Sequence, residues 1–326
     1  MPRVAVLDDY QGVALQMADW SVLPADCQVQ VFRDHLTELD ALAERLRDFE
    51  VITCMRERTP FGRDILQRLP NLRLLVTTGM RNAAIDLKAA SDLGILVCGT
   101  AGGPDAPPAE LTWGLILALV RHIPREDALT RQGHWGTTVG MSLEHKILGV
   151  LGLGRLGSKV ARAGVAFDMT VIAWSQNLTA ERAAQHGATL VTKDELFARS
   201  DILTIHVQLS ARTRGLVGAR ELGLMKPTAY LINTARGPIV DEAALIQALQ
   251  ARTIAGAGLD VFDQEPLPPG HPLTLLDNTI LVPHIGYVTE DQYRVRYRET
   301  VENVAAYLKG EPLRVLNPDV RATARQ

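Results

Sequence analysis

Short apolar runs alternate with amphipathic stretches along the first part of the chain. The apolar runs are rich in β-branched and aliphatic residues and cover 3–7, 29–32, 51–53, 72–77 and 95–97. Segments with helical periodicity lie between them, including 39–47 and 86–93, and Gly94 stands where the second of these helices would end. Strands that alternate with helices predict a parallel sheet covered by helices on both faces.

A second alternating series runs from 146 to 284. Its expected strands are 147–151, 170–173, 202–206, 229–233, 256–260 and 279–282. These runs are almost continuously apolar, which is typical of strands buried on both faces. An amphipathic helix is expected over 291–308, with Gly310 at its end. The fold class predicted is α/β, with two doubly wound parallel-sheet domains.

The composition changes sharply around residue 100. Glycines and prolines gather at Gly99, Gly102, Gly103, Pro104, Pro107 and Pro108, and a helical pattern over 109–120 follows at once. Prolines suit a linker and the first turn of a helix. We therefore expect the chain to pass here from one domain into the other.

The totals are those of a folded globular protein of two domains. The chain has 326 residues, 47% of them hydrophobic and 22% charged, with a net charge of −3. The lack of a basic excess argues against a nucleic-acid partner, and an anionic substrate would need locally placed arginines. The 3 cysteines are far apart, so we expect neither a disulfide framework nor a metal site.

The chain start shows no secretory pattern. The sequence MPRVAVLDDY enters a strand-like run directly, without a basic region followed by an apolar one. The apolar run 115–120 is far too short to span a membrane. We expect a cytoplasmic protein that does not bind membranes.

A glycine-rich loop follows the first strand of the second series. Residues 147–160 read ILGVLGLGRLGSKV, which places Gly152, Gly154 and Gly157 as G-x-G-x-x-G between a strand and a helix. Glycines also mark plain tight turns, but this context favours a dinucleotide-binding loop. Gly152 would permit the turn, Gly154 would let the backbone approach a pyrophosphate, and Gly157 would let the helix pack against the strand.

The residue expected to grip the adenosine ribose departs from the usual pattern. NAD-binding domains place an acidic residue at the end of the second strand, but Ser175 stands there in AWSQNLT. No arginine follows immediately to hold a 2′-phosphate; Arg182 comes later, on the next helix. Ser175, Gln176 and Asn177 suit a ribose or a phosphate equally, so NAD and NADP both remain open.

Three later strand ends each carry one candidate catalytic residue. Arg236 follows a strand in AYLINTARG, Glu265 follows one in AGLDVFDQEP, and His284 lies in ILVPHIG. Open α/β sheets bind their ligands beyond the carboxyl ends of their strands. His284 would exchange a proton with the substrate oxygen, Glu265 would orient its ring, and Arg236 would clamp a carboxylate. This chemistry suits hydride transfer between a nicotinamide and a 2-hydroxy or 2-keto acid.

The chain resembles the D-isomer-specific 2-hydroxyacid dehydrogenase family, which includes glycerate, hydroxypyruvate/glyoxylate, phosphoglycerate and D-lactate dehydrogenases. The resemblance rests on ILGVLGLGRLG, INTARGPIVDEAAL, AGLDVFDQEPLP, NTILVPHIG and NVAAYLKGEP and covers nearly the whole chain. It implies that Arg236, Glu265 and His284 are catalytic. It also implies a Rossmann-type NAD(P) domain, over 104–290, inserted in a flavodoxin-like substrate domain of 1–103 plus 291–326, and a homodimer.

The resemblance implies further site residues. The cofactor contacts would be Gly152, Gly154, Arg155, Leu156, Gly157, Ser175, Thr213, Ala235, Asp260 and Gly286. The substrate would contact Gly79, Met80, Arg81, Arg236 and Tyr287. Trp135 matches a family tryptophan and is expected to pack near the dimer region.

Two positions depart from the family pattern and concern the substrate. The loop after the fourth strand reads TTGMRNAAID, with Arg81 and Ala83 where a glycine and an acidic residue are usual. Arg81 either adds a second positive contact or faces solvent. Tyr287 replaces a usual glycine in HIGYVT, and its ring would narrow or reshape the substrate pocket.

Rival functions remain on the same scaffold. One is a phosphite-type dehydrogenase, and another is a nucleotide-sensing or corepressor-type binding protein, which some relatives are. Formate dehydrogenase is disfavoured, because those relatives carry glutamine where Glu265 stands. The substrate expected is a small 2-hydroxy or 2-keto acid of unspecified identity.

Overall fold

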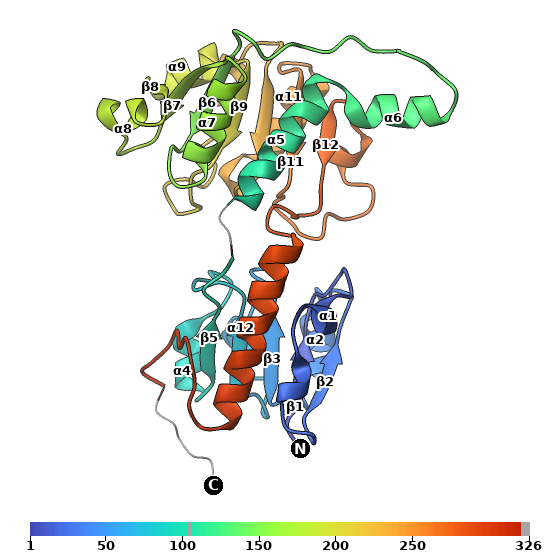
Figure 1. The fold of residues 1–326 in the computed structure, drawn as a ribbon, viewed down its shortest axis with the longest axis vertical. Helices are drawn as coiled ribbons and strands as arrows, with labels where there is room; N and C mark the ends of the chain where they lie inside the picture. Colours follow the sequence, from blue (N-terminus) through green and yellow to red (C-terminus); the bar gives the residue numbers. More distant parts are fainter. Residues whose placement is uncertain (104–105, 321–326) are drawn as a thin grey trace. The chain divides into compact units, whose positions relative to one another are not determined.

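The computed structural model describes residues 1–103 and 106–320. The chain forms two compact units: Met1–Pro104 with Val288–Gln326, and Asp105–Tyr287 (Figure 1). The first passage between the units falls at Pro104 and Asp105, outside the described residues. The second passage lies earlier than the expected one at 290–291, because Thr289 already caps the final helix by accepting a hydrogen bond from the N–H of Gln292.

The first unit is a five-stranded parallel sheet with the order β2-β1-β3-β4-β5. This is the flavodoxin-like order, so the fold expected for this part of the chain is confirmed. Its strands are β1 Arg3–Val6, β2 Gln28–Val31, β3 Val51–Cys54, β4 Leu74–Thr77 and β5 Leu96–Gly99. Its helices are α1 Ala14–Met17, η1 Trp20–Val22, α2 Leu39–Leu46, α3 Arg63–Leu66, α4 Leu87–Asp92 and α12 Glu290–Leu308.

Neighbouring residues on its strands face opposite sides, which explains the continuous apolar runs. On one face, Val4 and Leu74 pack against α12 through Val301 and Val304. On the other face, Ala5 and Leu75 pack against α2, α3 and α4. Helix α12, although distant in sequence, therefore covers one face of the sheet formed by the first part of the chain.

The second unit is a seven-stranded parallel sheet with the order β12-β11-β10-β9-β6-β7-β8. Successive strands are added outwards on one side of β6 and then on the other side from β9, as in a Rossmann fold. The expected fold class is confirmed. Its strands are β6 Ile147–Leu151, β7 Thr170–Trp174, β8 Ala188–Leu190, β9 Ile202–Ile205, β10 Tyr230–Asn233, β11 Gly256–Leu259 and β12 Thr279–Leu281. The edge strand β8 was not predicted, because it has only 3 residues and is not buried throughout.

Helices cover both faces of this sheet (Figure 1). They are α5 Pro107–Val120, α6 Ile123–Arg131, α7 Gly157–Ala166, α8 Ala180–Ala184, α9 Lys193–Arg199, α10 Ala219–Leu224, η2 Gly237–Ile239, α11 Glu242–Gln250 and η3 Pro272–Leu275. Residues of α5 and α7 pack on one face, and residues of α9, α10 and α11 pack on the other. Among the described residues, no helix is both long and apolar enough to cross a membrane.

Candidate active site

The glycine loop has room for a phosphate where the motif requires it. Gly152 has a φ of +101°, and a Cβ there would lie 2.8 Å from backbone atoms of His206 and Val207. A Cβ on Gly157 would lie 2.1 Å from the Gly152 carbonyl oxygen, whereas a Cβ on Gly154 would meet nothing within 4 Å. The loop is therefore closed towards the protein at Gly152 and Gly157 and open at Gly154, which fits a dinucleotide pyrophosphate.

The helix that follows supplies donors to this open side. Helix α7 begins at Gly157, directly after Leu156. The backbone N–H groups of Gly154 and Leu156 have no acceptor among the described residues. Arg155 is exposed beside them. Free N–H groups at a helix start, with the positive end of the helix dipole, form an anion site.

The other predicted cofactor residues occupy different surroundings. Ser175 is partly buried directly after β7, and Leu178 closes a turn by donating its N–H to the Ser175 carbonyl. Thr213 is committed to its own loop, where its hydroxyl donates to the Gln208 carbonyl at 2.6 Å and accepts from the Ser210 N–H at 2.8 Å. The geometry thus gives Thr213 a loop-stabilising contact, and its predicted contact with the cofactor stays a prediction.

The structure brings two of the three predicted catalytic residues into contact. Nδ1 of His284 lies 2.6 Å from a carboxylate oxygen of Glu265. The second oxygen of Glu265 accepts the N–H of Phe262 at 2.9 Å. The carboxylate is thereby anchored to its own loop, and it holds the imidazole through Nδ1, leaving Nε2 as the nitrogen for proton exchange.

Asp260 fixes the backbone that follows His284. His284 has a φ of +50°, a conformation that residues other than glycine seldom adopt. One oxygen of Asp260 accepts the N–H of Ile285 at 2.6 Å, and the other accepts the N–H of Gly286 at 3.0 Å. Burial raises the pKa of Asp260 to about 6, so it is ionised at neutral pH and both oxygens can accept. Asp260, predicted as a cofactor contact, is engaged with this loop on both oxygens.

Arg236 lies on a loop whose backbone is held by hydrogen bonds to the side chain of Asn233. The buried Asn233 side chain donates to the Arg236 carbonyl at 3.0 Å and accepts the N–H of Ala235 at 3.0 Å. Arg236 is partly buried, and its guanidinium donates to the Ala235 carbonyl at 2.7 Å. Asn233 escaped the sequence analysis because it reads as the last residue of an apolar strand.

The loops of Arg236 and Glu265 touch each other through their backbones. A Cβ on Gly237 would lie 2.1 Å from the carbonyl of Phe262, whose N–H is bound to Glu265. Only glycine allows this approach. The three candidate catalytic loops are consequently linked: Gly237 packs on the Glu265 loop, and Glu265 contacts His284.

Tyr287 packs beside the candidate catalytic histidine. Its side chain is buried, and its ring meets the His284 ring edge-on with centroids 5.6 Å apart. A glycine there would leave one side of the imidazole uncovered. The expectation that Tyr287 shapes the surroundings of His284 thus has a physical basis, while contact with substrate stays a prediction.

The predicted substrate loop of the first unit follows β4. Gly79 has a φ of +100°, and its N–H donates to the Thr100 hydroxyl at 2.9 Å. The side-chain amide of Asn82 donates to the Arg56 carbonyl at 2.7 Å, fixing the other end of the loop. Between these anchors Met80 and Arg81 are exposed, and their N–H groups have no acceptor among the described residues. Such a loop offers donors to an anion.

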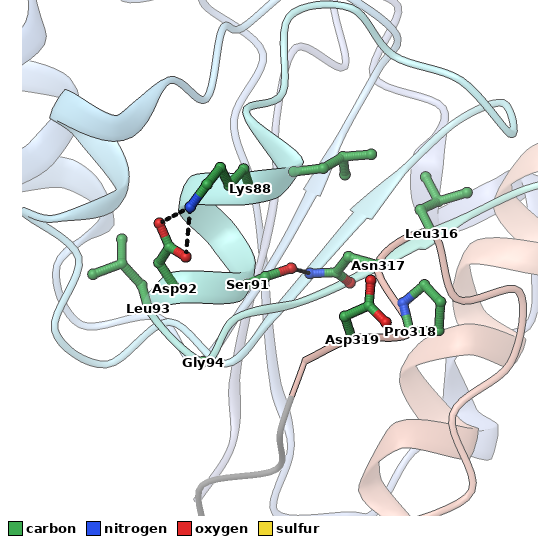
Figure 2. Close-up of a pocket in the computed structure, with 10 residues that line it drawn as sticks. Lys88, Ser91, Asp92, Leu93, Gly94, Leu316, Asn317, Pro318 and Asp319 are labelled. Carbon is green, nitrogen blue, oxygen red and sulfur yellow. Dashed lines mark hydrogen bonds and ion pairs between the residues drawn. The ribbon is translucent and has the colours of Figure 1, made fainter.

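A hollow of about 780 Å³ lies at the opposite edge of the same sheet, between α4 and the segment after α12 (Figure 2). Two of its charged groups, Lys88 and Asp92, are paired with each other at 3.0 Å. Asn317 donates to the Ser91 hydroxyl at 3.1 Å and accepts the N–H of Val97 at 2.8 Å. The hollow therefore reflects the seating of the C-terminal segment on β5, and we assign it no reaction.

Comparison with known proteins agrees with this geometry. Residues 113–286 match the family described as D-isomer specific 2-hydroxyacid dehydrogenase, NAD binding domain. A glyoxylate reductase of Aeropyrum pernix is 40% identical over 79% of this chain and 80% of its own length. A D-3-phosphoglycerate dehydrogenase of Methanocaldococcus jannaschii is 37% identical, but the chain spans only 52% of it.

A solved structure shares the fold over the whole chain. The structure of a putative D-3-phosphoglycerate dehydrogenase oxidoreductase from Ralstonia solanacearum matches with a TM-score of 0.91 and 36% identity, covering 99% of each chain. The match includes both parallel sheets and the helix α12 that returns to the first of them.

Proposed function

The chain belongs to the D-isomer specific 2-hydroxyacid dehydrogenase family, and from this premise we propose how its own residues carry the reaction. It is an NAD-dependent oxidoreductase that acts on a CH–OH group. We propose that it interconverts a small 2-keto acid and the D-2-hydroxy acid, with Asp105–Tyr287 as the dinucleotide domain and the remaining residues as the substrate domain. The observation that carries the proposal is the 2.6 Å contact between Glu265 and Nδ1 of His284.

In the direction of reduction, bound NADH supplies the hydride that the C2 carbon of the keto acid accepts. The electron pair of the C=O bond moves onto the oxygen, and His284 donates a proton to that oxygen from Nε2. His284 is left neutral, with its Nδ1–H still donating to the carboxylate of Glu265. In the reverse direction neutral His284 removes the hydroxyl proton, so one residue serves as acid and base.

The carboxylate of the substrate requires positive partners. We propose that Arg236 binds it through the planar guanidinium, which matches a carboxylate in two-pronged fashion. We propose that the exposed N–H groups of Met80 and Arg81 form a further part of the anion site. The buried Tyr287 would limit the size of the group at C2, which favours small acids.

A dehydrogenase explains the site better than the rival functions. A nucleotide sensor or corepressor needs the glycine loop but has no use for an imidazole oriented by a carboxylate. In this chain Glu265, Asp260 and Asn233 are all engaged in orienting the loops of His284 and Arg236. Phosphite oxidation receives no specific support from the described residues.

The experiment follows NADH and NADPH absorbance with glyoxylate, hydroxypyruvate, pyruvate and larger 2-keto acids. Oxidation with at least one small acid is expected, and chiral analysis of the product should give the D isomer. The ratio of the reaction rates with NADH and with NADPH also tests the role of Ser175, because its side chain lacks the negative charge that excludes a 2′-phosphate. If the protein binds the dinucleotide but stays silent with every acid, the proposed substrate class is wrong.

We also propose a homodimer. Trp135 is 88% exposed and Val139 is 94% exposed, in the segment that follows α6. Large apolar side chains that stand so far out of a surface are typical of an interface, and the same segment of a second copy would cover them. Sedimentation should show a dimer, and Trp135→Ser should shift the population towards monomer. The cytoplasmic location stays a prediction.

A further inference from the structure

The loop that carries Glu265 lacks the backbone hydrogen bonds that hold most segments in place. It covers 260–271, between β11 and η3, and includes the sequence EPLPPG. Among the described residues, no backbone N–H from 261 to 270 donates to a backbone carbonyl. Proline has no N–H to donate, so side chains have to supply the hydrogen bonds that fix this loop.

One carboxylate outside the loop contacts it on both sides of Glu265. Glu242 is the first residue of α11, and its side chain is 19% exposed. One of its oxygens accepts the N–H of Asp263 at 3.2 Å, and the other lies 3.2 Å from Nε2 of His271. Glu242 therefore bridges the part of the loop that precedes Glu265 and the part that follows it.

His271 contacts Glu242 in one tautomer. Its Nδ1 atom accepts the N–H of Leu273 at 3.3 Å and thereby caps η3. An imidazole nitrogen that accepts a hydrogen bond carries no proton, so the ring carries its proton on Nε2 and donates it to Glu242. This hydrogen bond holds the Glu242 side chain in the position from which it reaches Asp263.

The Asp263 backbone leads directly to the candidate catalytic pair. Asp263 follows Phe262, whose N–H donates to Glu265 at 2.9 Å. Two consecutive backbone N–H groups thus donate to two carboxylates, those of Glu265 and Glu242. The Glu265 carboxylate also contacts Nδ1 of His284 at 2.6 Å. A displacement of the backbone at Asp263 would therefore move the group that anchors Glu265.

We propose that Glu242, held by His271, is a positioning residue that keeps Glu265 in the orientation required by the catalytic imidazole. This inference rests on the proposed function, because it needs His284 as acid and base. A misplaced imidazole slows proton exchange, whereas the groups assigned to the acid and the dinucleotide stay in place. Loss of the Glu242 contacts should therefore lower kcat without changing the KM for the acid.

The test measures kcat, the KM for a reactive 2-keto acid and the dissociation constant of NADH. Glu242→Ala removes both contacts, and kcat should fall about tenfold, the worth of one hydrogen bond to a charged group, with both binding constants nearly unchanged. Glu242→Gln keeps an oxygen that can accept the N–H of Asp263, so its kcat should stay within about threefold of the wild type. Glu242→Met, which keeps the length of the side chain, replaces Glu242→Ala if the latter does not unfold cooperatively.

Two substitutions separate the two hydrogen bonds of His271. His271→Asn keeps an oxygen that can accept the N–H of Leu273 but is too short to reach Glu242, so kcat should fall about fivefold. His271→Gln ends in an amide that can donate to Glu242 but loses the cap. It should melt at a lower temperature than the wild type and keep a nearly normal kcat.

Asp201→Ala is the matched control at the opposite edge of the same sheet. The Asp201 side chain is 16% exposed, accepts the N–H of Ile147 at 2.8 Å and pairs with Lys226 at 2.7 Å. Its loss should lower the melting temperature and leave kcat unchanged.

A normal kcat in Glu242→Ala, with the wild type active, would overturn the positioning role and leave the dehydrogenase proposal intact. Equal losses of kcat in Glu242→Ala and Glu242→Gln would also overturn it, because the amide keeps the acceptor for the backbone. A wild type inactive with every 2-keto acid would instead contradict the proposed function, on which the positioning role depends.

Discussion

The two sheets of this protein place functional groups at the same kind of edge but hold them differently. At the carboxyl edge of the second sheet, the side chains of Asn233, Asp260 and Glu265 form hydrogen bonds to the loop backbone or to another side chain. At the carboxyl edge of the first sheet, the loop of Met80 and Arg81 is tied only at its two ends.

The difference matches the two tasks that we assign. Proton exchange requires the imidazole to keep one orientation, since a small misplacement of a reacting group is costly. Anion binding requires only donors that reach the ligand, and free backbone N–H groups suffice. Substitutions among the hydrogen-bonded loops of the second sheet should therefore lower turnover. Substitutions in the loop of Met80 and Arg81 should instead raise the KM for the acid.

The largest effect is expected for His284→Ala. Turnover should fall at least about a hundredfold, the low end of what general acid–base catalysis contributes. NADH affinity should change little, because the ring is assigned to the substrate oxygen. Steady-state kinetics and fluorescence titration measure the two quantities separately. A parallel loss of NADH affinity would make His284 a structural or cofactor-binding residue.

Arg236→Lys comes next. Lysine keeps the charge but cannot present two parallel N–H donors, so kcat/KM for the keto acid should fall about tenfold or more, about the worth of a charge-assisted hydrogen bond. Arg81→Lys is the comparison in the open loop and should have a much smaller effect, because its contribution there comes from backbone N–H groups. Unchanged kinetics in Arg236→Lys would remove Arg236 from the carboxylate site.

Asp260→Asn tests the hydrogen bonds that hold the backbone after His284. The amide can still accept one of the two N–H groups but presents its own NH₂ to the other, so the strained backbone at His284 loses a hydrogen bond. We expect kcat to fall about tenfold, the worth of one charge-assisted hydrogen bond, with KM for the acid nearly unchanged. A rise in the NADH dissociation constant with normal kcat would instead support the direct cofactor contact predicted from the sequence.

The smallest effect concerns stability against pH. Burial lowers the pKa of His206 to about 4 in the folded state, from 6.5 in the unfolded chain. The unfolded state therefore takes up the proton first, and this contribution to stability is complete above about pH 6.5 and is lost as the pH falls towards 4. At pH 5 the part of this contribution that has been lost amounts to about 2 kcal/mol.

Chemical unfolding of wild type and His206→Gln at pH 7 and pH 5 measures this contribution. The wild type should lose more of its free energy of unfolding between the two pH values than the variant does. Identical losses would mean that His206 titrates normally in the folded protein.

The sequence predicted the parts of the molecule that leave a periodic or spaced pattern. The two sheets, the glycine loop and the strand ends of Arg236, Glu265 and His284 could be found because each depends on residues near one another in the chain. The edge strand β8 was missed, because a short, partly exposed strand has no distinct apolar run.

The supporting contacts could not be read in the same way. Asp260 and His206 were placed inside expected strands, yet each lies one residue beyond its strand. Their partners are 25 and 55 residues away in sequence, Ile285 for Asp260 and Leu151 for His206. Only the pairing of strands brings such residues together, and it depends on the packing of the whole sheet.

The central claim is that His284, oriented by Glu265, exchanges a proton with an acid held by Arg236. The most direct test is an experimental structure of the complex with NADH and oxamate, an unreactive analogue of pyruvate. We predict that Nε2 of His284 lies about 3 Å from the oxamate carbonyl oxygen and that Arg236 contacts the carboxylate. An oxamate bound away from His284, or with its carboxylate on the imidazole, would contradict it.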